Sequence, residues 1–216
     1  MLASRTPLIH TLPAVGVGIA LLCTLVLLTA ADANAQTTLT DVYRQQNITN
    51  QTAMTVLGSW AAVNIIGGAY LSTRTTGEDK YFHQMNALWN TVNLSIAAVG
   101  YFTALKGSGN PSAFNVINDH YGFQKVLLFN TGLDVGYVIG GAYLLERSKN
   151  DTDRADQWKG WGRALVLQGA FLFCFDLTTY IIHHTHDRAL ERAIERVSIS
   201  DSGIGIRYSL SVANKR

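Results

Sequence analysis

The chain has 216 residues, of which 48% are hydrophobic and 15% are charged, and its formal net charge is +2. This length is typical of one domain, and the small charge, without a basic patch interleaved with aromatic residues, argues against a nucleic-acid partner. The charged residues gather in short segments between long uncharged ones. This distribution favours a membrane protein over a soluble one.

The N-terminus, residues 1–35, has the features of an export signal. Arg5 supplies a short basic region, residues 15–29 are strongly apolar, and Ala-Asn-Ala at 33–35 fits a signal-peptidase site. Cleavage would make Gln36 the mature N-terminus. Without cleavage the segment would remain as a further helix, and the sequence leaves both outcomes open.

Four later segments have about the 20 residues that a helix needs to cross a bilayer. None contains proline, and each contains glycine, which is common where membrane helices pack closely. Backbone groups in lipid must be satisfied within their own segment, so the predicted fold is an all-α membrane bundle of four transmembrane helices. A soluble four-helix bundle would need charged outer faces, which these segments lack. The predicted spans are residues 54–73, 84–105, 123–145 and 161–183.

The first and third spans contain nearly the same sequence, Ile-Ile-Gly-Gly-Ala-Tyr-Leu at 65–71 and Val-Ile-Gly-Gly-Ala-Tyr-Leu at 138–144. A shift of roughly 73 residues superimposes them, and a shift one residue shorter then places Trp89 on Trp161 in the second and fourth spans. One repeat is therefore a helical hairpin. Both hairpins cross in the same sense, as in a parallel repeat about an axis along the membrane normal.

The charges of the loops predict the orientation. Residues 74–82 and 146–160 form the tips of the two hairpins and carry Lys and Arg, whereas residues 107–122 carry neither, although Lys106 and Lys125 flank them. Basic loops stay in the cytoplasm. We therefore expect a multi-pass protein of the bacterial inner membrane, with cytoplasmic hairpin tips and both mature termini in the periplasm.

The C-terminal residues 187–216 are predicted to lie outside the membrane. Residues 187–197 place apolar side chains on one helical face, which fits an amphipathic helix on the outer membrane surface or a solvated extension of the last helix. Alternating residues around Asp-Ser-Gly at 201–203 predict a β-hairpin. The expected domains are a signal peptide (1–35), a transmembrane domain (36–186) and an extracytoplasmic tail (187–216).

Hydrogen-bonding side chains recur at helical spacing within the spans. Because an amide or a carboxyl in lipid is costly, these faces are expected to point into the bundle. The amides either bond helix to helix, each contributing on the order of 1 kcal/mol, or line a cavity that binds a ligand. Carboxyls in a membrane tend to mark function, and we place Asp134 near mid-bilayer and Asp176 nearer the outer interface. The candidate ligand-binding residues are Asn86, Asn90, Asn93, Asn130, Asp134 and Asp176.

Histidines at the outer end of the last span are a weaker candidate. His183 and His186 share a helical face, and Asp119 and His120 are expected on the same side of the membrane. No motif of a known metalloenzyme accompanies them, so we predict no metal site. Haem would need two axial ligands at one depth, whereas His83 and His183 belong to opposite membrane faces, and we predict no cofactor.

A set of aromatic, amide, glycine and carboxyl positions in the spans forms a pattern that is moderately specific for one protein family. It consists of Phe82-His83-Gln84-Met85-Asn86, Trp89-Asn90, Asn93, residues 132–141, Trp161-Gly162, Gln168-Gly169 and Phe175-Asp176. These positions resemble an uncharacterised family of small exported bacterial membrane proteins with four helices. The resemblance covers roughly residues 54–183. It implies the fold and the membrane location, and it carries no catalytic role.

Three functions fit these features. The first is a non-enzymatic membrane component that binds a small polar ligand or a lipid headgroup, or passes a small solute, so that Asp134→Asn and Asn90→Leu would abolish binding or flux. The second is an assembly subunit whose C-terminal tail recruits a protein partner. The third is a membrane-embedded enzyme that uses Asp134 or Asp176 as acid or base. In each case membrane lipid is the expected surrounding.

Overall fold

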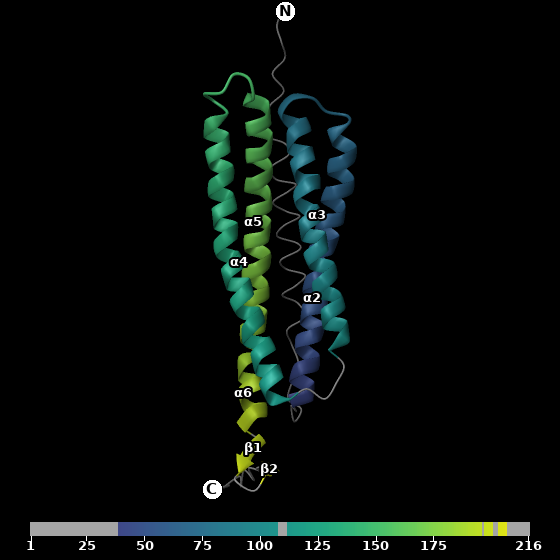
Figure 1. Cartoon of the computed structure of the whole chain (residues 1–216), viewed down its shortest axis with the longest axis vertical. Coiled ribbons are helices and arrows are strands. Elements are labelled where there is room, and N and C mark those ends of the chain that lie inside the picture. The colour runs from purple at the N-terminus through teal and green to yellow at the C-terminus, as the bar shows by residue number, and fades with distance from the viewer. Residues whose placement is uncertain (1–38, 108–111, 196, 201–202, 207–216) are drawn as a thin grey trace, which may run out of the picture.

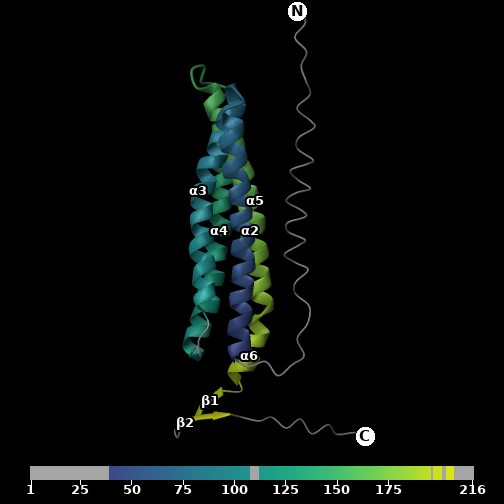
Figure 2. The same ribbon diagram turned by 90° about the vertical axis from the view of Figure 1, so that its right-hand side faces the viewer.

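The computed structural model describes residues 39–107, 112–195, 197–200 and 203–206. Four long helices lie side by side in an elongated bundle (Figure 1). They are α2 (Leu39–Ser72), α3 (Gly77–Lys106), α4 (Ala113–Arg147) and α5 (Ala155–Thr185). The short elements at the lower end of Figure 2 are α6 (Asp187–Glu195) and the antiparallel strands β1 (Val197–Ser200) and β2 (Gly203–Ile206). The predicted four-helix architecture is thus confirmed for the described residues.

Two predicted segments fall wholly or partly outside this description. The expected signal peptide, residues 1–35, is one of them. The other is the tail, where the turn at 201–202 and residues 207–216 are not described. The export signal and the β-hairpin therefore stay predictions.

The helices are longer than the spans that hydropathy predicts. They contain between 30 and 35 residues, and at 1.5 Å per residue they measure roughly 45 to 53 Å. The hydrocarbon core of a bilayer is about 30 Å thick. Each helix is therefore longer than a bilayer core is thick, and α2 in particular begins at Leu39 rather than at residue 54.

The four helices form two hairpins, α2–α3 and α4–α5, whose tips lie at the same end of the bundle (Figure 1). The hairpins pack against each other mainly through α3 and α5, whereas α3 and α4 have almost no close backbone approach.

Glycine lets the two helices of each hairpin approach closely. A Cβ on Gly68 would lie 3.0 Å from the backbone nitrogen of Ala87, and a Cβ on Gly141 would lie 2.8 Å from the backbone oxygen of Gly162. Gly68 and Gly141 are the second glycines of the two repeated sequences. The first glycine of each pair has no described atom outside its own stretch of helix within 4 Å of that position. The repeated sequences therefore make the same kind of contact in both hairpins.

Charged residues join the hairpins at their tips. Arg163 Nη1 on α5 donates to Glu78 Oε1 (2.9 Å) and to Asp79 Oδ1 (2.8 Å) on α3. Lys159 Nζ is 2.5 Å from Glu78 Oε2. Between the two basic residues, Gly160 packs against the backbone of α3 at Glu78. The beginnings of α3 and α5 are thereby held together.

The tip of the second hairpin is closed by Asp151. Its carboxylate accepts hydrogen bonds from Trp158 Nε1 and from the backbone nitrogen of Arg154, both at 2.9 Å. These bonds hold the pKa of Asp151 below its usual value, and the bond from the indole of Trp158 has the largest effect. The guanidinium of Arg147 lies over the Trp158 ring, 4.5 Å from its centroid. The tip is therefore an ordered turn.

The apolar face of α6 packs against the bundle. Leu190 is fully buried and Ala193 nearly so, in a cluster with Val42 of α2 and Val116 of α4. A helix lying with this face on a membrane surface, one of the two predicted alternatives for residues 187–197, does not match this packing. The same contact explains why α2 extends to Leu39, because Val42 has a hydrophobic partner there.

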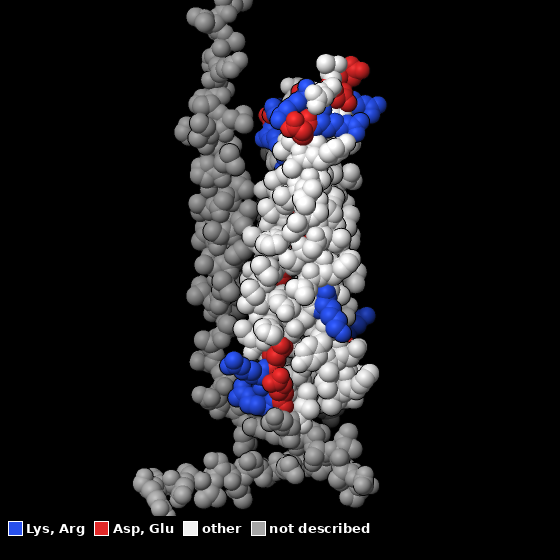
Figure 3. Space-filling view, turned by 90° about the vertical axis from the view of Figure 1, so that its left-hand side faces the viewer, with Lys and Arg blue, Asp and Glu red and all other residues white. Residues whose placement is uncertain are grey.

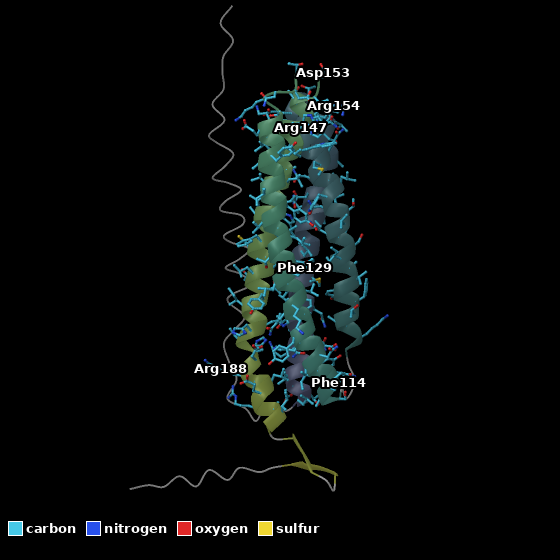
Figure 4. The ribbon with its side chains drawn as sticks, turned by 60° about the vertical axis from the view of Figure 1, so that its left-hand side comes forward. Phe114, Phe129, Arg147, Asp153, Arg154 and Arg188 are labelled. Atoms are coloured by element: carbon cyan, nitrogen blue, oxygen red, sulfur yellow. The ribbon has the colours of Figure 1, made fainter. Side chains whose placement is uncertain are left out.

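Apolar side chains cover the middle of the bundle. Two helical stretches, Leu39–Ser72 and Ala155–Ile194, are long and apolar enough to cross a membrane by length and composition. Large apolar side chains also point outward from α2 and α4, with Ile66 71% and Phe129 67% exposed. On the face in Figure 3, a broad uncharged band separates charged residues at the two ends. Figure 4 places Phe129 midway along α4, between Arg147 and Arg188 near opposite ends.

Candidate functional site

One group of interior amides forms a hydrogen-bond network centred on Gln168 of α5, which is fully buried. Gln168 Nε2 donates to Asn86 Oδ1 on α3 (2.6 Å) and more weakly to Asn64 Oδ1 on α2 (3.4 Å). Trp60 Nε1 donates to Gln168 Oε1 (3.0 Å). The network therefore joins three helices. We did not predict Gln168 as an interior residue.

Asn90 extends this network along α3. It is fully buried, and its Nδ2 donates to the backbone oxygen of Asn86 (2.8 Å). Its Oδ1 accepts from Asn93 Nδ2 (3.2 Å). Asn86 in turn donates to the backbone oxygen of Phe82 (3.0 Å). Asn86 therefore bonds to a neighbouring helix, as the first interpretation expects, whereas both bonds of Asn90 stay within α3.

Gln168→Leu tests this network. The substitution keeps a similar volume but leaves Asn86 Oδ1 and Trp60 Nε1 without their partner. An unsatisfied buried polar group costs about 1–3 kcal/mol, so we expect the free energy of unfolding to fall by about that amount. Unfolding in mixed micelles measures the change, with Gln84→Leu on the exposed side of α3 as the control. Equal stability of the two variants would show that the network contributes nothing.

Asp134 of α4 and Asp176 of α5 form a second polar group. They are 2% and 6% exposed, and their carboxyl groups share a side-chain hydrogen bond. Because a carboxylate can only accept, this bond requires a proton on one of the two groups. Asp134 Oδ2 has no hydrogen-bond partner among the described residues. The pair is therefore only partly satisfied by the protein.

The two carboxyls meet at one depth, whereas we predicted Asp176 nearer the outer interface. Helical side chains lean towards the N-terminus of their own helix. Since α4 and α5 run in opposite directions, Asp134 and Asp176 lean towards each other. The backbones of the two residues lie at different depths in the bundle, and their side chains span this difference.

A cavity of about 240 Å³ lies beside the carboxyl pair. Asn93 of α3 and Asn130 of α4 also line it, so four of the six predicted residues come together there. Trp89 and Tyr137 form one wall, with their rings edge to face and their centroids 4.7 Å apart. The other two predicted residues belong to the amide network and do not line the cavity. The cavity thus combines carboxyl, amide and aromatic groups.

A third cluster lies near α6. His120 is buried, with its Nδ1 2.7 Å from Gln46 Nε2 and its Nε2 2.5 Å from Asp187 Oδ1. Gln124 Nε2 donates to the same Asp187 oxygen (2.7 Å). These bonds join α2 and α4 to the beginning of α6, so the cluster holds α6 in place.

His183 lies next to this cluster, with its ring centroid 6.1 Å from that of His120. It is buried, and neither ring nitrogen has a hydrogen-bond partner in the described part of the chain. Both histidines line a second cavity, of about 440 Å³. Among the described residues, no three His, Cys, Asp or Glu side chains are grouped so that they could hold a metal ion.

A comparison with protein families matches residues 56–177 to a family of unknown function (DUF6992). This match covers more than half of the chain. The chain belongs to the DUF6992 family. No curated protein and no solved structure matches it. The family agrees with the predicted resemblance to an uncharacterised group, and its description assigns no activity.

The DUF6992 match includes the amide network and the carboxyl pair. It begins four residues before Trp60 and ends just after Asp176. His183 and α6 lie beyond its end. Within this member of DUF6992, all residues that line the carboxyl cavity except Met54 lie in the matched region.

Proposed function

We propose that this DUF6992 protein is an integral membrane protein that binds a small molecule carrying a cationic or hydrogen-bond-donating group at Asp134 and Asp176. One observation carries the proposal: Asp134, whose buried Oδ2 has no hydrogen-bond partner among the described residues, lines a cavity in the apolar middle of the bundle. A buried carboxyl that the protein leaves partly unpaired is costly. A ligand that donates to it removes this cost.

The distribution of charge supports the membrane location. Each long helix has a stretch of about 20 residues or more without Lys, Arg or Glu, enough to cross a bilayer. The only Asp residues in these stretches are the buried pair. Many large apolar side chains around them are exposed, as is typical of a surface that contacts lipid or a partner. The stretches lie between Arg44 and Arg74, Lys80 and Lys106, Lys125 and Glu146, and Arg163 and Asp187.

The orientation follows from the hairpin tips. Both tips lie at one end of the bundle, and both carry Lys and Arg. By the positive-inside rule we place this end in the cytoplasm of a bacterial inner membrane. Residues 36–186 would then be the transmembrane domain, after a signal peptide at 1–35. The tail 187–216 would lie in the periplasm.

The chemistry of the cavity favours a cation. The carboxyl pair keeps one oxygen, Asp134 Oδ2, without a hydrogen-bond partner among the described residues. Trp89 and Tyr137 supply aromatic surface within the same cavity, and aromatic faces attract ammonium groups, with more gain where water is excluded. Asn93 and Asn130 add neutral hydrogen-bonding groups. A small organic ammonium group matches this combination better than an anion does.

A titration of the purified protein in lipid nanodiscs tests the proposal. We use three probes of the same size: butylammonium, butanol and butanoate. We expect butylammonium to bind, and to bind at least about tenfold more tightly than the other two. If butylammonium binds no better to the protein than to empty nanodiscs, the proposal is wrong.

The two other predicted functions are less supported. In an assembly role, α6 would contact the protein partner. The apolar face of α6 already packs against Val42 and Val116. An enzyme would use the same carboxyl pair, and the other ionisable side chain among the lining residues of the cavity is the phenol of Tyr137. Ligand binding therefore remains the proposal.

A further inference from the structure

The carboxyl cavity opens sideways, towards the outside of the bundle, between α3 and α4. Four of its lining residues are aliphatic and between 41% and 59% exposed, whereas the carboxyls on its inner side are buried. α3 and α4 themselves have almost no close backbone approach. We call this rim the α3–α4 opening. It consists of Val92 and Ile96 on α3 and Val126 and Leu133 on α4.

The internal repeat shows why the cavity is open on this side. The groove between α2 and α5 is the counterpart of the groove between α3 and α4. It is filled by Trp60, whose ring stacks on Phe171 with 3.9 Å between centroids and bonds to Gln168. The shift between the repeats places Leu133 at the position of Trp60 and Ile96 at that of Gln168. A smaller side chain thus stands where the indole closes the other groove, and an apolar side chain stands where the amide bonds to that indole.

An aliphatic rim constrains the ligand. A hydrated ion would have to shed its water between side chains that offer no hydrogen bond, which costs free energy. An apolar chain would lose nothing there, because the exposed rim faces lipid in the proposed membrane location. The opening therefore suits a molecule with a polar head and a hydrocarbon tail.

We infer that the ligand is an amphipathic amine that reaches the cavity from within the bilayer through the α3–α4 opening. This inference rests on the proposed function, since it needs the carboxyl pair as the binding site. The amine arrives neutral in the lipid. Its nitrogen takes the shared proton from the carboxyl pair, which leaves an ammonium cation beside two carboxylates. The tail stays in the opening, between Val92 and Val126.

The second cavity offers a competing route from the outer end. It shares Met54, Phe123 and Val126 with the carboxyl cavity. The rings of Phe123 and His183 lie 4.9 Å apart on that route. A water-soluble cation would use it, and such a ligand would gain nothing from a longer tail.

A chain-length series in nanodiscs distinguishes the two routes. We compare butylamine with dodecylamine, and dodecylamine with dodecanol, after subtracting partition into empty nanodiscs. We expect dodecylamine to bind at least tenfold more tightly than butylamine and dodecanol. Leu133→Trp, which copies the filled groove, is expected to remove this tail-dependent gain. Phe129→Trp, on the exposed side of α4, is the control and is expected to keep it.

The outcomes separate the inference from the proposed function. If butylamine and dodecylamine bind equally and Leu133→Trp changes neither, the site exists but the ligand does not use the α3–α4 opening. If no amine binds, the proposed function fails as well. Should Leu133→Trp fail to fold, Ile96→Phe narrows the same opening from α3, and retention of the full tail-dependent gain in that variant would overturn the inference.

Discussion

Asp134→Asn is expected to weaken butylammonium binding at least about thirtyfold while the protein stays folded. Removing one member of a buried charged pair typically costs 2–5 kcal/mol of binding, and asparagine has nearly the volume of aspartate. The carboxyl is 2% exposed, so water cannot replace the lost charge. Calorimetric titration in nanodiscs measures the binding, and thermal unfolding of the same samples measures the stability.

Asn90→Leu is the matched comparison. Its amide is bonded to Asn86 and Asn93 and does not line the cavity. We expect this variant to lower the free energy of unfolding by about 1–3 kcal/mol and to leave butylammonium binding within about threefold of the parent. From the sequence we expected both substitutions to abolish binding. An Asp134→Asn variant with unchanged affinity, or an Asn90→Leu variant that folds normally but does not bind, would contradict the separation of the two sites.

Gly141→Leu is expected to disrupt the second hairpin, whereas Gly140→Leu is expected to be tolerated. A side chain on Gly141 would meet the backbone of Gly162 and the nitrogen of Val166, both 2.8 Å from its Cβ. Backbone atoms cannot move aside without separating the helices, and overpacking a close contact costs about 1–3 kcal/mol or more. Gly140 has no such neighbour among the described atoms.

This adjacent pair controls for helix propensity, since both variants replace a helical glycine by leucine. Stability in detergent and the yield of folded protein measure the difference, which we expect to exceed about 2 kcal/mol. The repeat predicts the same contrast for Gly68→Leu and Gly67→Leu in the first hairpin. Equal effects at both positions of a pair would mean that the hairpin helices do not meet at their glycines.

The direction of the polar side chains could be predicted from the sequence. Amides and carboxyls recur at helical spacing among apolar residues, and the cost of exposing them to lipid leaves only the interior. The buried positions of Asn90 and Asp134 follow from this argument. Which amide bonds to which neighbour could not be predicted, because it depends on the register between helices. That register is set by contacts such as Gly141 with Gly162, which composition alone does not specify.

Gln168 shows how a residue can be missed. In the last span Gly162, Gly169 and Asp176 suggest an inner face, and they are seven residues apart. An α-helix has 3.6 residues per turn, so a seven-residue spacing drifts around the helix and describes a narrow stripe. Gln168 lies beside this stripe, still inside the bundle. An uncharged amide in an otherwise apolar span was the signal that could have identified it.

The positions at which the helices end also could not be predicted from hydropathy. Residues 39–53 are polar, and nothing in their composition shows that Val42 packs under Leu190 of α6. The paired depth of Asp134 and Asp176 likewise depends on the lean of side chains on antiparallel helices rather than on distance along the sequence. Local patterns thus identified the elements and their inner faces, and contacts between distant segments decided the site.

The most direct test of the membrane location is to measure whether lipid or water surrounds Phe129 and Asp153. Figure 4 places Phe129 midway along α4 and Asp153 at the hairpin tip. Spin labels are attached to Phe129→Cys and Asp153→Cys in a background with Cys23 and Cys174 replaced by alanine, in nanodiscs. We expect the label at 129 to be relaxed by oxygen, which dissolves in lipid, and the label at 153 by a water-soluble nickel chelate. A label at 129 that is relaxed by the nickel chelate as strongly as the label at 153 would contradict the membrane-embedded site.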